Sequence, residues 1–552
     1  MPEPWEEKVA ARRKVLAAQI PEEWRVALPT PTEVPSAMVE GSTTAIDECL
    51  AKILTPREIM ITTAPTGRLV GSLQTGAWTA EETMLAFCKR AAVGQQALNC
   101  AADMFFDEAL AKAREHDAFR LETGTTKGPL HGLPISVKDV FDQAGKINTA
   151  GLVSRLDRVA TADAQLVAIL QDAGAIPFIR TATSQACQLV ESITNVYGTV
   201  RNPWNRALSA GGSSGGEGAL VAFHGSPLGL GTDGGGSLRL PASWNGIYTI
   251  KPTSMRIPGN GSGCGTSDSN AAGYGPLAPD MDAVKLFCQT VLAAQPWRSN
   301  PAVVPLPWNP AVTAPTKLKI GFLYDDGIVH NCPPVDRCLR EAASQLQAAG
   351  HEIVELGKDW ARIHRAAAGV AFKMYTQEGG VGFKAELEKS GEPLVPRTCT
   401  GWSERRLTPM EIWLNHREKK MLRQEYVVAF NALGLDAVVT APMPHPAPPH
   451  GEYITSAISA VYNALDMPAT TIPFGRVDAA KDVASPAWYA ETPYPDMPDF
   501  PYDRYDADMK KLYTGPDVFA NAPLGLQIVT LPLTEEYNVA VSEVVDKLLN
   551  KK

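Results

Sequence analysis

The sequence lacks the features that mark membrane-embedded, secreted and nucleic-acid-binding proteins. Nowhere do roughly eighteen consecutive apolar residues occur, so no bilayer-spanning helix is expected. Residues 1–30 are charged and contain no apolar signal-peptide segment. The 51 Lys and Arg against 60 Asp and Glu leave a formal charge of −9. That charge is too small, and of the wrong sign, for a protein that holds nucleic acid or anionic lipid through its overall field.

Disulfide and metal-binding patterns are also missing. The 9 cysteines include no CxxC pair, and an odd number suits reduced thiols better than a disulfide framework. We therefore expect a cytoplasmic protein. What is present in quantity is apolar material, 45% of the 552 residues, which is enough for a large globular core.

Strand and helix patterns alternate in the first half of the chain. A capping box at 79–82 starts a helix, an apolar strand covers 133–137, a helical repeat covers 163–174, and a second apolar run ends at Ile179. This alternation predicts an α/β fold with a central mixed, mostly parallel sheet wrapped by helices. We expect a helical amino-terminal extension at 1–75 and a single domain at 76–552, with a variable region at about 300–430 shaping the pocket.

Two glycine-dense stretches, 209–218 and 229–237, contain two short motifs that conflict with each other. The GxGxxG at 229–234 would bind a dinucleotide, but Pro241 stands where the following helix should continue. The GxSxG at 211–215 would make Ser213 the nucleophile of a Ser-His-Asp hydrolase. That scheme needs His445 or His450, and both lie in a proline-rich stretch without independent support.

A third interpretation uses both stretches together with a lysine upstream of them. LHGLPISVKDVF (130–141), GGSSGGEGALVAF (211–223) and GLGTDGGGSLRLPA (229–242) resemble the amidase signature family in order, residue type and spacing. APLGLQIV at 522–529 also resembles a family segment. The glutamate in SSGGEGAL, the length and the Trp-containing amino-terminal extension are most similar to the fungal acetamidase group and to its relative, fatty acid amide hydrolase.

The resemblance implies a Ser-Ser-Lys triad. Ser237 matches the family's nucleophile, Ser213 the serine of a cis peptide that relays the proton, and Lys138 the base. The chemistry agrees, because a serine hydroxyl attacks poorly until a base removes its proton, and a lysine can be that base only when its surroundings keep it neutral. Lys138 ends an apolar strand, so we expect it to be buried.

The resemblance also implies an oxyanion hole and a group of supporting residues. The oxyanion hole would consist of the backbone amides of Gly234, Gly235, Gly236 and Ser237. The residues expected to hold this loop and the triad in place are Ser214, Thr232, Asp233 and Arg239. The chain departs from the family pattern at Arg180-Thr-Ala182, where an amide side chain that often braces the site is absent.

The expected reaction is hydrolysis of a linear carboxamide to a carboxylate and ammonia or an amine, through an acyl-enzyme and without metal or organic cofactor. The expected partner is a small-molecule amide substrate, with a homodimer as a candidate assembly. Two alternatives stay open: an amidase or esterase of a secondary-metabolite pathway, and a glutaminase subunit that passes ammonia to a partner protein. A catalytically inactive binding module is disfavoured because all three triad residues are present.

Overall fold

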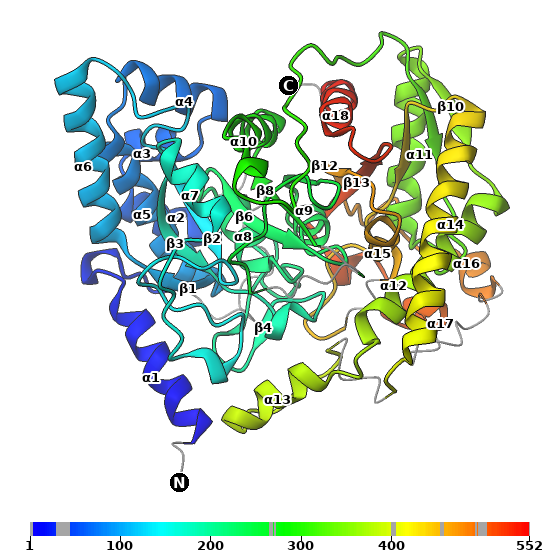
Figure 1. Cartoon of the computed structure of the whole chain (residues 1–552), viewed down its shortest axis with the longest axis horizontal. Coiled ribbons are helices and arrows are strands. Elements are labelled where there is room, and N and C mark those ends of the chain that lie inside the picture. The colour runs from blue at the N-terminus through cyan, green and yellow to red at the C-terminus, as the bar shows by residue number, and fades with distance from the viewer. Residues whose placement is uncertain are drawn as a thin grey trace.

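The chain folds around one large twisted sheet with helices on both sides (Figure 1). The computed structural model describes residues 4–28, 45–263, 269, 272–398, 405–452, 457–491, 494 and 505–550. The sheet has 11 strands in the order β1-β3-β2-β6-β8-β7-β12-β13-β11-β9-β10. Their bounds are β1 Ala101–Met104, β2 Pro134–Lys138, β3 Ile176–Thr181, β6 Gly229–Asp233, β7 Tyr248–Lys251, β8 Gly273–Ala278, β9 Lys319–Phe322, β10 Glu352–Glu355, β11 Ala437–Thr440, β12 Ala469–Arg476 and β13 Pro523–Val529. A separate pair of short strands joins β4 Ile193–Thr194 to β5 Gly198–Thr199.

The helices surround this sheet, with the amino-terminal helices at one end of the molecule and the helices at 333–348 and 409–433 at the other (Figure 1). Their bounds are α1 Trp5–Ala18, α2 Ala45–Ile53, α3 Pro56–Thr62, α4 Thr66–Thr75, α5 Ala80–Leu98, α6 Phe106–Thr123, α7 Gln165–Asp172, α8 Gly215–Ala222, α9 Arg239–Asn245, α10 Met281–Ala293, α11 Pro333–Ala348, α12 Lys358–Thr376, α13 Val381–Ser390, α14 Pro409–Leu433, α15 Ala457–Ala464, α16 Pro486–Ala490, α17 Tyr505–Leu512 and α18 Glu535–Leu549. The predicted start of α5 is confirmed, because the Thr79 side chain accepts a hydrogen bond from the Glu82 amide and caps the helix.

The expected α/β fold with a mixed sheet is confirmed, but parallel neighbours are fewer than predicted. The parallel pairs are β2–β3, β2–β6, β9–β11 and β9–β10, and the other neighbouring strands of the large sheet are antiparallel. Parallel neighbours need a long crossover connection, usually a helix. Strand β8 runs antiparallel to β7, and the described residues between the two strands form no helix, a pairing that the helix–strand alternation upstream does not reveal.

Strands β2, β3 and β6 are buried along their whole length, as parallel strands covered by helices on both faces are. The described parts of 1–75 are helical or irregular, and apolar residues of α1 and α2 join the same core as the strands. Within the variable region, the described residues of 358–433 include the helices α12, α13 and α14, joined by turns and irregular segments.

Two further features of the structure are the state of the cysteines and the apolar length of the helices. Every cysteine in the described ranges is a free thiol, and Cys264 and Cys399 lie outside those ranges. Among the described helices, none is long and apolar enough to cross a membrane.

Candidate active site

The site lies where three parallel strands end. Lys138 is the last residue of β2, Thr181 the last of β3 and Asp233 the last of β6. Because these strands are parallel neighbours, their carboxyl ends meet at one edge of the sheet, the place where open α/β sheets bind ligands. The two predicted catalytic serines follow in loops, Ser213 just before α8 and Ser237 just before α9.

Lys138 is completely buried and contacts the predicted relay serine. Its Nζ donates to Ser213 Oγ at 2.7 Å and to Thr232 Oγ1 at 2.8 Å. The neighbouring Asp139 does not compete for it, because the Asp139 carboxylate pairs with Arg180 Nη2 at 3.0 Å and accepts from the Thr149 hydroxyl. A surface lysine paired with Asp139, the simplest structural interpretation of this residue, is therefore excluded.

Ser213 is held by its backbone so that its side chain meets the lysine. The peptide bond between Gly212 and Ser213 is cis. The Ser213 carbonyl accepts from Thr183 Oγ1 at 2.8 Å and from Ser192 Oγ at 3.1 Å. These two hydroxyls hold the Ser213 carbonyl, while the Ser213 hydroxyl contacts Lys138.

Ser237 differs from its two predicted partners in being partly exposed, while Lys138 and Ser213 are buried. Its carbonyl accepts from the Ser214 amide at 3.2 Å, which ties the Ser237 loop to the Ser213 loop. Among the described residues its hydroxyl forms no hydrogen bond with Ser213. The geometry thus brings Ser213 and Lys138 into contact, and places Ser237 at the accessible side of the same site.

The backbone amides of the glycine loop, residues 234–237, differ in whether a group of the protein accepts a hydrogen bond from them. The Gly236 amide donates to Asp233 Oδ1 at 2.7 Å and is therefore engaged within the protein. The amides of Gly235 and Ser237 donate to no acceptor in the part of the chain that the structure describes. Gly236 has φ +117°, a conformation that L side chains rarely adopt, so glycine is required there.

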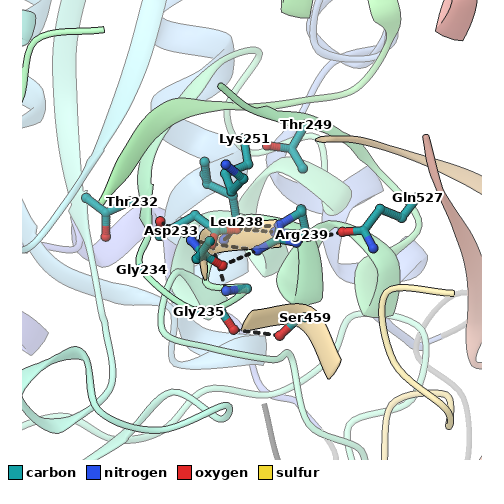
Figure 2. A network of polar contacts seen from close by, with 12 residues as sticks. Thr232, Asp233, Gly234, Gly235, Leu238, Arg239, Thr249, Lys251, Ser459 and Gln527 are labelled. Atoms are coloured by element: carbon teal, nitrogen blue, oxygen red, sulfur yellow. Dashed lines mark hydrogen bonds and ion pairs between the residues drawn. The ribbon is translucent and has the colours of Figure 1, made fainter. Parts of the chain in front are cut away.

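A buried ion pair anchors the start of this loop. Asp233 and Arg239 are fully buried and bond through both ends of the carboxylate, with Arg239 Nε and Nη2 each 2.9 Å from an Asp233 oxygen (Figure 2). Burial alone would raise the pKa of the Asp233 carboxyl, but the charge and hydrogen bonds of Arg239 outweigh it and hold that pKa well below its usual range. Arg239 also donates to Gln527 on β13 and to Asn463 on α15, at 2.6 Å each. The pair therefore connects the loop to the carboxy-terminal strands and helices.

A second buried carboxyl in this region is that of Glu217 on α8, which lies close enough to Lys138 for the charge of the lysine to act on it. It accepts from the hydroxyls of Ser136 and Thr181. Burial raises the pKa of Glu217 to about 8, although these hydrogen bonds and the charges of Lys138 and Arg180 act in the opposite direction. The glutamate that distinguished the SSGGEGAL motif is thus an internal group of the strand edge rather than a group open to substrate.

The two histidines required by the Ser-His-Asp alternative have other partners. His445 is buried against Trp244, its Nδ1 lies 2.7 Å from the carbonyl of Pro446, and burial lowers its pKa to about 4. His450 pairs with the buried carboxylate of Glu191 at 2.6 Å. In the hydrogen-bond network of the described ranges neither contacts Ser213 or Ser237, which leaves the nucleophile-elbow scheme without its base.

The dinucleotide motif lacks its helix as well, because α9 contains only 7 residues and includes Pro241. No group of three or more His, Cys, Asp or Glu side chains in the described ranges is arranged to hold a metal ion.

Sequence reasoning missed the hydroxyl and amide side chains that hold the loops of this site. Gln527 lies in the segment 522–529 that resembles the family, but the resemblance assigned no role to this residue. For the others no local pattern exists, since they come from loops and helices remote in sequence. They are Thr183, Ser192, Tyr375, Ser459 and Asn463.

Comparisons with known proteins identify the family to which the chain is similar. A family model described as Amidase matches residues 82–538. The acetamidase of Aspergillus oryzae is 33% identical over 563 aligned residues, covering 99% of each chain. The acetamidase of Emericella nidulans is 31% identical, covering 100% of this chain and 99% of its own. A solved structure of a fatty acid amide hydrolase superposes with a TM-score of 0.90 at 30% identity, covering 99% of this chain and 95% of that one.

The fold, the strand-edge site and these matches define an amide hydrolase. The chain belongs to the amidase signature family.

Proposed function

We propose that the chain hydrolyses a linear carboxamide through an acyl-enzyme formed on Ser237, with Ser213 and Lys138 as the proton-transfer pair. The observation that carries this proposal is the 2.7 Å contact between Lys138 Nζ and Ser213 Oγ in a fully buried setting. Lys138 Nζ also contacts Thr232 Oγ1 at 2.8 Å, and the carboxylate next to it in the sequence, Asp139, pairs with Arg180 instead.

The first half of the reaction is acylation. Ser237 Oγ attacks the amide carbonyl carbon while its proton passes to Ser213 Oγ, and the Ser213 proton passes to the neutral Lys138 amine. The same path in reverse delivers a proton to the leaving nitrogen, so that the C–N bond breaks and ammonia or an amine departs. An ester bond now joins the acyl group to Ser237.

The second half is deacylation. A water molecule takes the place of the departed amine, loses a proton through Ser213 to Lys138, and attacks the ester carbonyl carbon. Collapse of the second tetrahedral intermediate returns that proton to Ser237 Oγ and releases the carboxylic acid, which loses its remaining proton to solvent and becomes the carboxylate. Both tetrahedral intermediates carry a negative oxygen, and in this proposal the backbone amides of Gly235 and Ser237, with that of Gly234 beside them, stabilise it by donating hydrogen bonds.

The substrate class follows from the relatives that the chain resembles. Two are named for acetamide and one for fatty acid amides, and both are linear amides. We therefore infer a linear carboxamide as substrate and a single chain as sufficient for the chemistry, because every group in the mechanism comes from this chain.

The proposal is tested by covalent labelling. A fluorophosphonate should add to Ser237, as peptide mass spectrometry would show, and the Ser237→Ala variant should be unlabelled. The same variant should release ammonia from linear amides at least about 10³-fold more slowly than the wild type, because it lacks the atom that bonds to the acyl carbon. Labelling at Ser213 with Ser237 unmodified would refute the assignment.

A further inference from the structure

Two hydroxyl groups from the carboxy-terminal half of the chain reach the glycine loop. The Tyr375 hydroxyl, on α12, donates to the carbonyl of Gly234. The Ser459 hydroxyl, on α15, donates to the carbonyl of Gly235 at 2.5 Å, a contact that Figure 2 shows. Helices α12 and α15 pack against each other, so the two hydroxyls reach the loop from one helix pair.

The approach of both hydroxyls explains why glycines stand here. A Cβ on Gly235 would lie 2.7 Å from the Tyr375 hydroxyl oxygen, and a Cβ on Gly236 would lie 2.3 Å from Ser459 Oγ. Either side chain would displace the hydroxyl that now contacts the loop. The glycines thus admit the hydroxyls in addition to exposing the amides.

Because the peptide group is planar, a hydrogen bond that fixes a carbonyl also fixes the direction of the N–H of the next residue. In a trans peptide the C=O and the N–H of the next residue lie in one plane and point in opposite directions. Tyr375 therefore fixes the direction of the Gly235 N–H, and Ser459 fixes that of the Gly236 N–H. The Gly236 N–H already donates to Asp233 Oδ1 at 2.7 Å, whereas the Gly235 N–H has no acceptor in the described structure.

We propose that Tyr375 is a positioning residue, which keeps the Gly235 N–H directed at the oxygen that becomes negative during amide hydrolysis. This inference rests on the proposed function. A Gly–Gly peptide plane rotates easily, since neither residue has a side chain that hinders it. Rotation would turn the Gly234 carbonyl oxygen toward the negative oxygen in place of a donor. The Tyr375 hydroxyl opposes this rotation because the rotated plane loses its hydrogen bond.

The test is the Tyr375→Phe variant, which keeps the ring and removes the hydroxyl. Deleting an oxyanion-hole donor costs about 10²- to 10³-fold in kcat, and misorienting one should cost less. We expect kcat to fall about 10- to 100-fold with KM within about twofold of the wild type. A trifluoromethyl ketone, which forms a tetrahedral adduct on the nucleophile, should bind weaker by the same factor as kcat falls.

Ser459→Ala provides a matched control, because it also removes one hydroxyl from a loop carbonyl. It affects the peptide whose N–H Asp233 already holds, so kcat should stay within about threefold of the wild type. Rates are expressed per fluorophosphonate-titrated site, so that any unfolded fraction of either variant does not enter kcat. The melting temperature of each variant reports the purely structural part of the effect.

The outcomes separate the two proposals. If the wild type is not labelled at Ser237, the proposed function fails before Tyr375 is considered. If Ser237 is labelled but Tyr375→Phe keeps both its kcat and its affinity for the ketone, the positioning role is wrong. A raised KM with unchanged kcat would also overturn it, since Tyr375 would then bind the substrate instead of orienting a donor.

Discussion

Replacing Lys138 by methionine is the sharpest test of the base. Methionine has nearly the length of lysine but no basic nitrogen, and it can occupy the same fully buried space. Among the described residues, the polar contacts of the Lys138 amine are two hydroxyl oxygens at 2.7 and 2.8 Å, so the substitution leaves no carboxylate there without a direct partner. We therefore expect the variant to fold. Positioned general acid–base groups contribute about 10²- to 10⁴-fold, and kcat/KM should fall by that factor at alkaline pH.

The pH dependence of kcat/KM provides a second, quantitative test of Lys138 as the base. Only the neutral amine accepts a proton, so wild-type kcat/KM should rise with pH, by about tenfold for each pH unit on the ascending limb. The variant has no such group, and its kcat/KM should lack this limb. The ratio of the two rates should consequently shrink about tenfold for each unit of decreasing pH. Initial rates on an amide and an ester, from about pH 6 to about pH 9, measure this directly.

Lys251 supplies the control, because it is a second buried lysine close to the loop. Its Nζ donates to the Pro252 carbonyl at 2.9 Å, and burial lowers its pKa to about 8, which lies within the same pH range. We expect Lys251→Met to retain the ascending limb. A Lys138→Met variant with the limb intact, or its loss in Lys251→Met, would refute the assignment of the base.

Two further predictions concern the relay and the histidines. Ser213→Ala should lower kcat, but less than Ser237→Ala does, because a water molecule can occupy the position of the missing hydroxyl; steady-state rates of both variants on one amide measure the difference. Replacing His445 and His450 together by glutamine should leave kcat per titrated site within a few-fold, although loss of the contact with Glu191 should lower the melting temperature. A folded but inactive double variant would restore the Ser-His-Asp scheme.

The candidate site could be predicted from the sequence mainly through its resemblance to the amidase signature family. Local motifs alone left Ser213 as a possible nucleophile, whereas the resemblance implied that Lys138, Ser213 and Ser237 would act together. The structure brings Lys138 and Ser213 into contact and ties Ser214 to Ser237. These residues lie directly at the ends of strands and the starts of helices, so the quoted motifs remain short and continuous in the sequence and the resemblance can be recognised from them.

The pairing of strands required the tertiary structure. The alternation of strands and helices predicted parallel neighbours, and it holds for β2, β3 and β6, whose carboxyl ends form the edge of the candidate site. It does not extend to β7, β8, β12 and β13, which are antiparallel to their neighbours. Sequence periodicity reports whether a strand is buried, and not which strand lies beside it.

Partner choice among polar groups was likewise decided only by the fold. The sequence placed Asp139 next to Lys138, yet the carboxylate turns to Arg180, 41 positions further along the chain. The sequence indicated four equivalent loop amides, yet Asp233 engages that of Gly236. Tyr375 and Ser459 reach the same loop across 141 and 224 positions. A hydrogen bond depends on distance and direction in space, and contacts over such separations leave no periodic trace in the sequence.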